Sequence, residues 1–136
     1  MAAADIPKPD PVACSPVCPA GDQPSVAALR TRQPDRASFE RAGDLLRLVG
    51  DPTRLALVHA LVDGGELCVC DLAAVVGVSE NAASQALRLL RAADVVRTRR
   101  AGRRIYYRLA DAHVRLLVDV TMEHIGHDDP TGVAHG

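Results

Sequence analysis

The sequence predicts a mainly α-helical fold with one small β-hairpin. Of its 136 residues, 48% are apolar and only 2% are aromatic, so the core must be built from small aliphatic side chains. Such a composition favours packed helices over a β-sandwich. Apolar residues recur at spacings of three and four in several segments, whereas β-branched and aromatic residues cluster in two short stretches near residue 100. A chain of this length fits one small domain.

Five segments have the apolar spacing of an amphipathic helix. We expect helices over 39–49, 52–63, 71–76, 80–93 and 112–125. Ser38, Ser79 and Asp111 stand where side-chain caps are needed, and Pro52 suits the first position of its helix. Gly77 separates the third helix from the fourth, so these two form a short helical pair joined by a tight turn.

Two strands are expected after the fourth helix, over 95–98 and 105–109, with a turn at Ala101-Gly102 between them. The order is therefore a short helix, a glycine turn, a second helix and an arginine-rich hairpin. This order is typical of a winged helix-turn-helix. We expect it to dimerise through its N- and C-terminal helices.

The chain divides into three parts by composition. Residues 1–36 hold seven of the nine prolines, so we expect a flexible arm there with a short helical turn near residue 28. The DNA-binding and dimerisation domain is expected over 37–127, with a disordered tail over 128–136. We find neither an apolar run long enough to cross a membrane nor a secretory signal, so we expect a cytoplasmic protein without a membrane partner.

Double-stranded DNA is the partner that the charge distribution favours. The total net charge is −1, but eight arginines and one acid lie between Gln85 and Arg108. The second helix of such a pair enters the major groove, and the wing meets the DNA backbone. The candidate DNA contacts are Ser79, Glu80, Asn81, Ser84, Gln85, Arg88, Arg99, Arg100, Arg103 and Arg104. The alternative is a solvated arginine-rich face, but arginines massed at a hairpin tip favour DNA.

The four cysteines form two closely spaced pairs, Cys14 with Cys18 and Cys68 with Cys70. Thiolates in this number favour soft or borderline ions such as Cd²⁺, Pb²⁺ and Zn²⁺. Two alternatives stay open: a buried cysteine acting as a small apolar side chain, and a redox pair that would make the protein a thiol-responsive repressor. We expect no enzyme, because the sequence offers no base for a cysteine nucleophile.

Asp111, His113, His124 and His127 are candidate metal ligands on the last helix. Eleven residues separate His113 from His124, which places them on one face but about 16 Å apart along the axis. Zn–N bonds are only about 2 Å long, so one ion cannot join both within one helix. Two antiparallel copies of the helix would bring the start of one to the end of the other, and a homodimer would then hold two Zn²⁺ sites. The alternative is a set of surface histidines.

Four motifs in this order resemble the ArsR/SmtB family of bacterial metal-responsive repressors. They are Cys14-x-x-x-Cys18, Asp51-Pro52-Thr53-Arg54, Glu66-Leu67-Cys68-Val69-Cys70-Asp71-Leu72, and Asp111-x-His113 with His124-x-x-His127. The resemblance covers residues 38–127, and the N-terminal cysteine pair narrows it to the cadmium- and lead-responsive CadC branch. The reading helix differs, since it has Ser84-Gln85-Ala86-Leu87 where the family often has Ser-x-His-Leu.

The resemblance implies a homodimer with two kinds of inter-subunit metal site. Cys68 and Cys70 of one subunit would join Cys14 and Cys18 of the partner's arm in a thiolate site. Asp111, His113, His124 and His127 would form the second site. The metal-free dimer would bind an inverted-repeat operator, and Cd²⁺, Pb²⁺ or Zn²⁺ would act as the effector that releases it, so that metal-resistance or efflux genes are transcribed.

Overall fold

The computed structural model describes residues 23–127, and the chain divides into two units, Met1–Asp35 and Arg36–Gly136. The described part of the first unit contains helix α1 (Val26–Arg32). Its start is fixed by Ser25, whose Oγ accepts a hydrogen bond of 3.1 Å from the Ala28 N–H. A serine in this position satisfies a backbone donor that the helix cannot. The helical turn predicted near residue 28 is therefore present.

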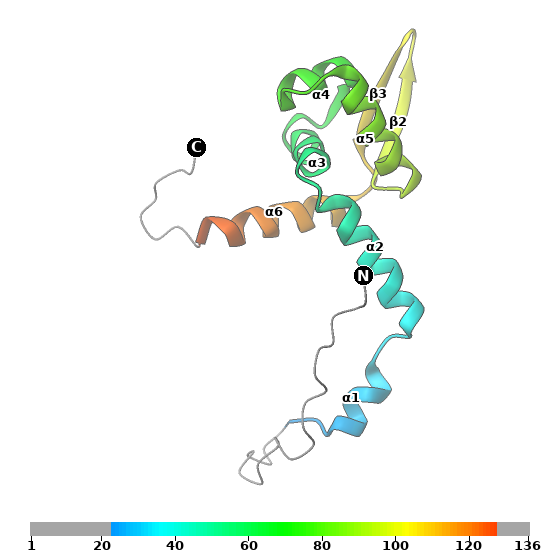
Figure 1. Ribbon diagram of the computed structural model, residues 1–136, viewed down its shortest axis with the longest axis vertical. Helices are drawn as coiled ribbons and strands as arrows, with labels where there is room; N and C mark the ends of the chain where they lie inside the picture. Colours follow the sequence, from blue (N-terminus) through cyan, green and yellow to red (C-terminus); the bar gives the residue numbers. More distant parts are fainter. Residues whose placement is uncertain (1–22, 128–136) are drawn as a thin grey trace. The chain divides into compact units, whose positions relative to one another are not determined.

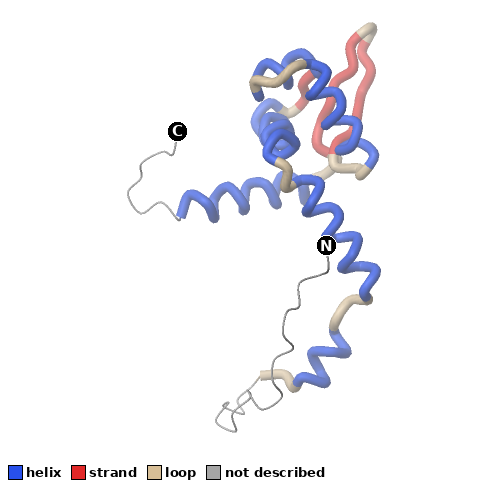
Figure 2. Tube along the Cα trace, in the orientation of Figure 1, coloured by secondary structure: helices blue, strands red, loops and turns tan. Residues whose placement is uncertain are grey.

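The second unit is mainly helical and contains one small sheet (Figure 1). Its elements in chain order are α2 (Arg36–Val49), α3 (Pro52–Gly64), β1 (Glu66–Cys68), α4 (Val69–Val76), α5 (Glu80–Ala92), β2 (Val96–Ala101), β3 (Arg104–Leu109) and α6 (Ala112–His127). The predicted fold class is confirmed, with the helical pair α4–α5 followed directly by the β2–β3 hairpin. This hairpin extends beyond the helices (Figure 2).

Polar side chains define where α3 and α5 begin. Asp51 accepts from the Arg54 N–H at 3.1 Å, and Ser79 accepts from the Ala82 N–H at 3.0 Å. The Arg54 guanidinium also donates to the Leu48 carbonyl at 2.7 Å, which ties the end of α2 to the start of α3. The Asp51-Pro52-Thr53-Arg54 motif is thus a helix start that also fixes the preceding helix.

Three local expectations need correction. Helix α2 begins at Arg36, so Ser38 lies inside its first turn and does not cap it. Helix α4 begins at Val69, two residues before the expected start, because extended Cys68 serves as its N-cap residue. The residues 66–68 also form a third strand, which is too short to give an alternating pattern in the sequence.

The sheet is antiparallel with strand order β1-β3-β2. Leu67 of β1 lies opposite Tyr107 of β3, which in turn lies opposite Thr98 of β2. Leu67 and Tyr107 pack against the hydrophobic core. Since side chains alternate across a strand, their neighbours Glu66, Cys68 and Tyr106 lie on the opposite face of the sheet, where Cys68 is buried and the other two are partly exposed. The cysteine strand and the wing strands therefore share this second face.

The core lies where α3, α4 and α5 pack together against the sheet. Its fully buried large side chains are Leu57, Leu61, Leu72, Leu87, Leu90, Val58, Val95, Val96 and Val118. Val118 is the one buried residue among the described side chains of α6. Large apolar side chains elsewhere on α6 are exposed, including Leu116, Val120 and Ile125. A helix with this much exposed apolar surface suits the predicted dimer interface.

Candidate metal centre and nucleic-acid interface

The Cys68-x-Cys70 pair stands at the junction between a strand and a helix. Cys68 is the last residue of β1, is 7% exposed and has an extended backbone. Cys70 lies in the first turn of α4 and is exposed. The pair therefore escapes the opposed side-chain directions that a regular helix would impose on residues i and i+2. Both thiols are free, so they fit the donor set that a thiophilic ion requires.

Cys70 contacts the first residue of the predicted reading helix. A hydrogen bond with the Glu80 side chain, together with the negative charge of that carboxylate, raises the pKa of the Cys70 thiol. Glu80 begins α5, and α4 packs directly on α5. A metal ion needs the thiolate form, so binding must displace the proton from this contact. The cysteine pair and the reading helix thus share an interaction.

Replacing Glu80 with glutamine is expected to make Cys70 more reactive at neutral pH. The neutral amide removes the charge that disfavours the thiolate, so the pKa of Cys70 falls and its alkylation by iodoacetamide accelerates several-fold. The rate is measured against pH with modification located by peptide mass mapping. The matched control is Glu40→Gln, since Glu40 is an exposed acid on α2 paired with Arg36. Equal rates in the two variants would contradict the contact.

The other half of the predicted thiolate site, Cys14 and Cys18, lies outside the described residues. Within residues 23–127 of this single chain, no cluster of three or more potential metal ligands is formed. Both predicted sites take ligands from two subunits, so one chain supplies only half of each. The residues of the candidate sites therefore stay predictions.

The candidate ligands of the last helix lie at its two ends. The Asp111 carboxylate accepts hydrogen bonds from the backbone N–H groups of His113 and Val114 at 2.9 and 3.2 Å. The bond from Val114, and to a smaller extent that from His113, lowers the pKa of the Asp111 carboxyl. His113 Nδ1 lies 3.5 Å from Asp111 Oδ1. His124 is exposed near the other end, and His127 is the last residue of α6, with its side chain outside the described set. Because α6 is one continuous helix, His113 and His124 of one chain remain about 16 Å apart.

Helix α5 presents its apolar residues inward and its polar residues outward. Ala83, Ala86, Leu87 and Leu90 are buried. Five candidate DNA contacts on or before this helix are exposed, and one, Ser84, is half-buried. The exposed five are Ser79, Glu80, Asn81, Gln85 and Arg88. Two of them already have partners inside the protein, since Ser79 caps the helix and Glu80 contacts Cys70.

The wing arginines differ in what they contact. Arg100, Arg103 and Arg104 are exposed around the hairpin turn, where Gly102 adopts a positive φ of 62°. Arg99 instead donates to the Glu66 carboxylate and lies over the Tyr106 ring. In the sequence, Glu66 belongs to the cysteine motif, but neither it nor Tyr106 is indicated as a partner of Arg99. Only the register of β1 on β3, which follows from strand pairing, could have indicated their proximity.

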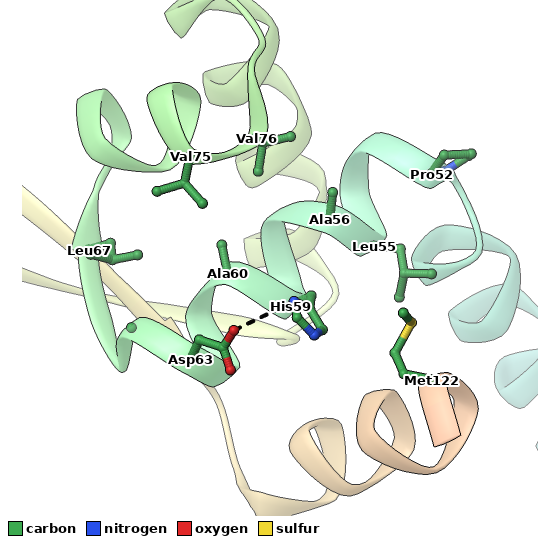
Figure 3. A pocket seen from close by; sticks show the side chains of 11 residues that line it. Pro52, Leu55, Ala56, His59, Ala60, Asp63, Leu67, Val75, Val76 and Met122 are labelled. Carbon is green, nitrogen blue, oxygen red and sulfur yellow. Dashed lines mark ion pairs between the residues drawn. The ribbon is translucent and has the colours of Figure 1, made fainter. Parts of the chain in front are cut away.

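An open, mainly apolar cavity of about 710 Å³ lies between α3, α4 and α6 (Figure 3). His59 Nδ1 and Asp63 Oδ2 are 4.0 Å apart at its edge, and Met122 reaches it from α6. None of the candidate metal ligands or DNA contacts lines this cavity. It is therefore separate from the candidate metal and DNA-binding sites.

Comparison with known proteins places this arrangement in a family. Residues 51–98 match the model of the bacterial regulatory protein, arsR family. A transcriptional repressor SmtB homolog from Synechocystis sp. is 43% identical over 119 residues, covering 84% of this chain and 87% of that protein. A cadmium resistance transcriptional regulatory protein CadC homolog from Staphylococcus aureus is 38% identical over 80 residues, covering 59% of this chain and 66% of that protein.

The fold likewise matches a solved structure. The homodimeric winged helix-turn-helix DNA-binding domain of Mb0332 from Mycobacterium bovis, a possible ArsR-family regulator, has a TM-score of 0.61 at 26% identity. The match covers 76% of this chain and 96% of that one. Among residues 23–127, no helix combines the length and apolar character needed to cross a membrane.

Fold and comparisons together define a winged helix-turn-helix transcriptional regulator, a class whose members act by binding DNA. The chain belongs to the ArsR/SmtB family of bacterial metal-responsive repressors. The SmtB and CadC homologs are named as transcriptional regulators, and neither is named as an enzyme. The resemblance drawn from the four sequence motifs is therefore confirmed at the level of the family.

Proposed function

We propose that the metal-free dimer of this protein binds an inverted-repeat operator and that Cd²⁺, Pb²⁺ or Zn²⁺ releases it, which derepresses metal-resistance or efflux genes. The observation that carries the proposal is the position of Cys70, in the first turn of α4, a helix that packs directly on the reading helix α5. A ligand that engages this thiol must alter an interaction made by the reading helix.

The thiolate site is proposed to form between subunits. Cys68 and Cys70 supply two sulfurs from one chain, and Cys14 and Cys18 of the other chain's arm supply two more. Four thiolates favour Cd²⁺ and Pb²⁺ over hard ions such as Mg²⁺ and also suit Zn²⁺. A bound ion would neutralise the thiolates; Cys68 at the end of β1 and Cys70 in the first turn of α4 would hold it from this chain.

The second proposed site joins Asp111 and His113 of one subunit to His124 and His127 of the other. Three imidazoles and one carboxylate match the four ligands that Zn²⁺ takes in tetrahedral sites. The Asp111 carboxylate already lies beside His113, so two of the proposed ligands are close together at one end of α6. The exposed apolar residues of α6 would be covered when two copies pack in this way.

Operator binding is proposed to use α5 in the major groove and the hairpin at the flanking backbone. Asn81 and Gln85 carry amides that can pair with adenine, and Arg88 lies one turn further along the helix. Arg100, Arg103 and Arg104 would meet phosphates. Release then requires that metal binds better to a dimer shape with the two reading helices wrongly spaced, which is a negative coupling of roughly 1–3 kcal/mol or more.

A metal panel tests the proposed function. A DNA fragment selected from random sequence by the metal-free protein is labelled, and its fluorescence anisotropy is followed as Cd²⁺, Pb²⁺, Zn²⁺ or peroxide is added. We expect release by one or more of the three ions. Release by peroxide with no response to any metal would replace this proposal with the thiol-responsive repressor.

Mixed dimers are expected to restore zinc binding that each parent has lost. In a Cys70→Ser background, subunits with His113→Ala are combined with subunits with His124→Ala, and the mixed dimer is purified by two different tags. Two-fold symmetry leaves one intact site in the mixed dimer and none in either parent, so about one Zn²⁺ should bind per mixed dimer. Binding is measured by competition with a chromophoric chelator. Mixed dimers that bind no more zinc than the parents would exclude an inter-subunit site.

A further inference from the structure

The Arg99 guanidinium is held by a residue from the far end of the cysteine strand. Its Nε lies 3.1 Å from both Glu66 carboxylate oxygens, and its Nη2 lies 2.8 Å from Oε1. This ion pair joins residues 33 positions apart in the sequence, whereas four other arginine–acid pairs of the described residues join residues three or four positions apart. Unlike those four pairs, it connects distant elements, β1 and β2.

The same guanidinium also packs over an aromatic ring. Its carbon Cζ lies 5.1 Å from the centroid of the Tyr106 ring, within the range of a cation–π contact. Tyr106 lies directly opposite Arg99 in the β2–β3 ladder and directly opposite Cys68 in the β1–β3 ladder. Cys68, Tyr106 and Arg99 therefore form one row across the same face of the sheet. Glu66 lies on that face two residues before Cys68, and its carboxylate accepts a hydrogen bond from Arg99.

The physical effect of this cluster is on geometry more than on stability. The Arg99 and Glu66 side chains are 53% and 33% exposed, and ion pairs this open to water add little to stability. A fork of two donors against two oxygens does fix orientation, because it restrains both direction and rotation. This fork orients the Arg99 guanidinium toward Glu66.

We propose that Glu66, Arg99 and Tyr106 form a tie between the cysteine strand and the wing, through which metal bound at Cys68 and Cys70 changes the contacts that the wing makes with DNA. The inference rests on the metal-sensing function proposed above. Glu66, Arg99 and Tyr106 are positioning residues, because none of them is a proposed metal ligand.

The small size of β1 explains how a change at Cys68 would reach the wing. The strand has only three residues, and in the described part of the chain it pairs with β3 alone. Cys68 is its last residue and Glu66 its first, so a displacement of Cys68 toward a metal ion moves the whole strand. Glu66 then carries the Arg99 guanidinium with it, and Arg99 belongs to the strand that leads to the wing tip. The wing responds to the metal without contacting it.

The test compares Glu66→Gln with Asp94→Asn in the full-length protein. The first change removes the charge of the tie while keeping the side chain's size. The second breaks the Arg97–Asp94 pair of 3.4 Å, which involves the same strand but does not reach β1, and asparagine tolerates the positive φ of 57° at this position. For each protein, operator affinity is measured with and without Cd²⁺, and Cd²⁺ binding without DNA is followed by thiolate-to-metal absorption.

Glu66→Gln is expected to reduce the Cd²⁺-induced loss of operator affinity at least about fivefold, the lower end of usual couplings, while Cd²⁺ binding stays within about twofold. Asp94→Asn should keep the wild-type loss. The exchange Glu66→Arg with Arg99→Glu should restore part of the response, because it rebuilds the pair with reversed charges. If Glu66→Gln kept the wild-type Cd²⁺-induced loss of operator affinity, or if it lost Cd²⁺ binding, the proposed role of the tie would be wrong. Absence of release by Cd²⁺, Pb²⁺ and Zn²⁺ alike in the wild-type protein would instead overturn the proposed function, and the tie with it.

Discussion

Replacing Cys70 with serine is expected to abolish release by Cd²⁺ while leaving operator binding of the metal-free protein within about twofold of wild type. A serine hydroxyl stays protonated and is a hard donor, so it cannot stand in for a thiolate toward a soft ion. Cys70 is exposed, so the change leaves the core intact. The measurement is an anisotropy titration with Cd²⁺, in which the variant should stay bound to the operator at the Cd²⁺ concentration that releases the wild-type protein.

Two further variants separate the thiolate site from the second site. Cys68 is buried, so alanine is the cleaner replacement there; a serine would leave a buried hydroxyl that costs about 1–3 kcal/mol if unpaired. Cys68→Ala should behave like Cys70→Ser. The pair His113→Ala with His124→Ala should keep the response to Cd²⁺ and lose that part of the response to Zn²⁺ which depends on α6. If the Cys70→Ser variant left the operator at the same Cd²⁺ concentration as the wild-type protein, the thiolate site would not be the sensor.

Replacing Leu87 with alanine is expected to destabilise the protein by about 2–5 kcal/mol, the usual cost of removing a large side chain from a packed core. Leu87 is fully buried on the inward face of α5, at the centre of the cluster that joins this helix to α3 and α4. A loss of this size is a large part of the roughly 5–15 kcal/mol that such domains have. Urea unfolding followed by circular dichroism measures it, with all samples at one protomer concentration because a dimer's stability depends on concentration.

Leu89→Ala is the matched control for Leu87→Ala. Leu89 lies two residues away on the same helix and is 49% exposed, so its replacement should change the free energy of unfolding by no more than about 0.5 kcal/mol. The two variants have the same change in composition and in helix propensity. Similar losses for both would mean that the inward face of α5 has been assigned wrongly.

Most of the fold could be predicted because its signals are local. The apolar spacing of α3 and α5, their caps at Asp51 and Ser79, and the turn at Gly77 all lie within a few residues of the elements they define. Strand β1 could not be predicted in this way, because its three residues form a strand only by pairing with residues 106–108. The start of α2 was placed too late because Ser38 has the chemistry of a cap, although the chain is already helical from Arg36.

The candidate sites likewise include features with local sequence signals and features that depend on tertiary contacts. The two cysteine pairs and the histidines are recognised by residue type and spacing, which the sequence displays directly. The contact of Cys70 with Glu80 and the ion pair of Glu66 with Arg99 depend on how α4 meets α5 and how β1 meets the sheet. Nothing in the local pattern distinguishes Arg99 from its neighbour Arg100, yet only Arg99 has Glu66 within reach. The tertiary arrangement therefore decides which of the two arginines pairs with Glu66.

The short strand β1 also bears on the order in which the fold can form during synthesis. A ribosome releases residues 66–68 about forty residues before their pairing partners in β3, so the emerging cysteine strand at first has no ladder to join. By the time residues 104–109 have emerged, α5 and the hairpin turn have already been made. In a nascent chain, Cys68 therefore lacks its partner Tyr106 until α5 and most of the hairpin have been made. The first strand to be made is among the last to be paired.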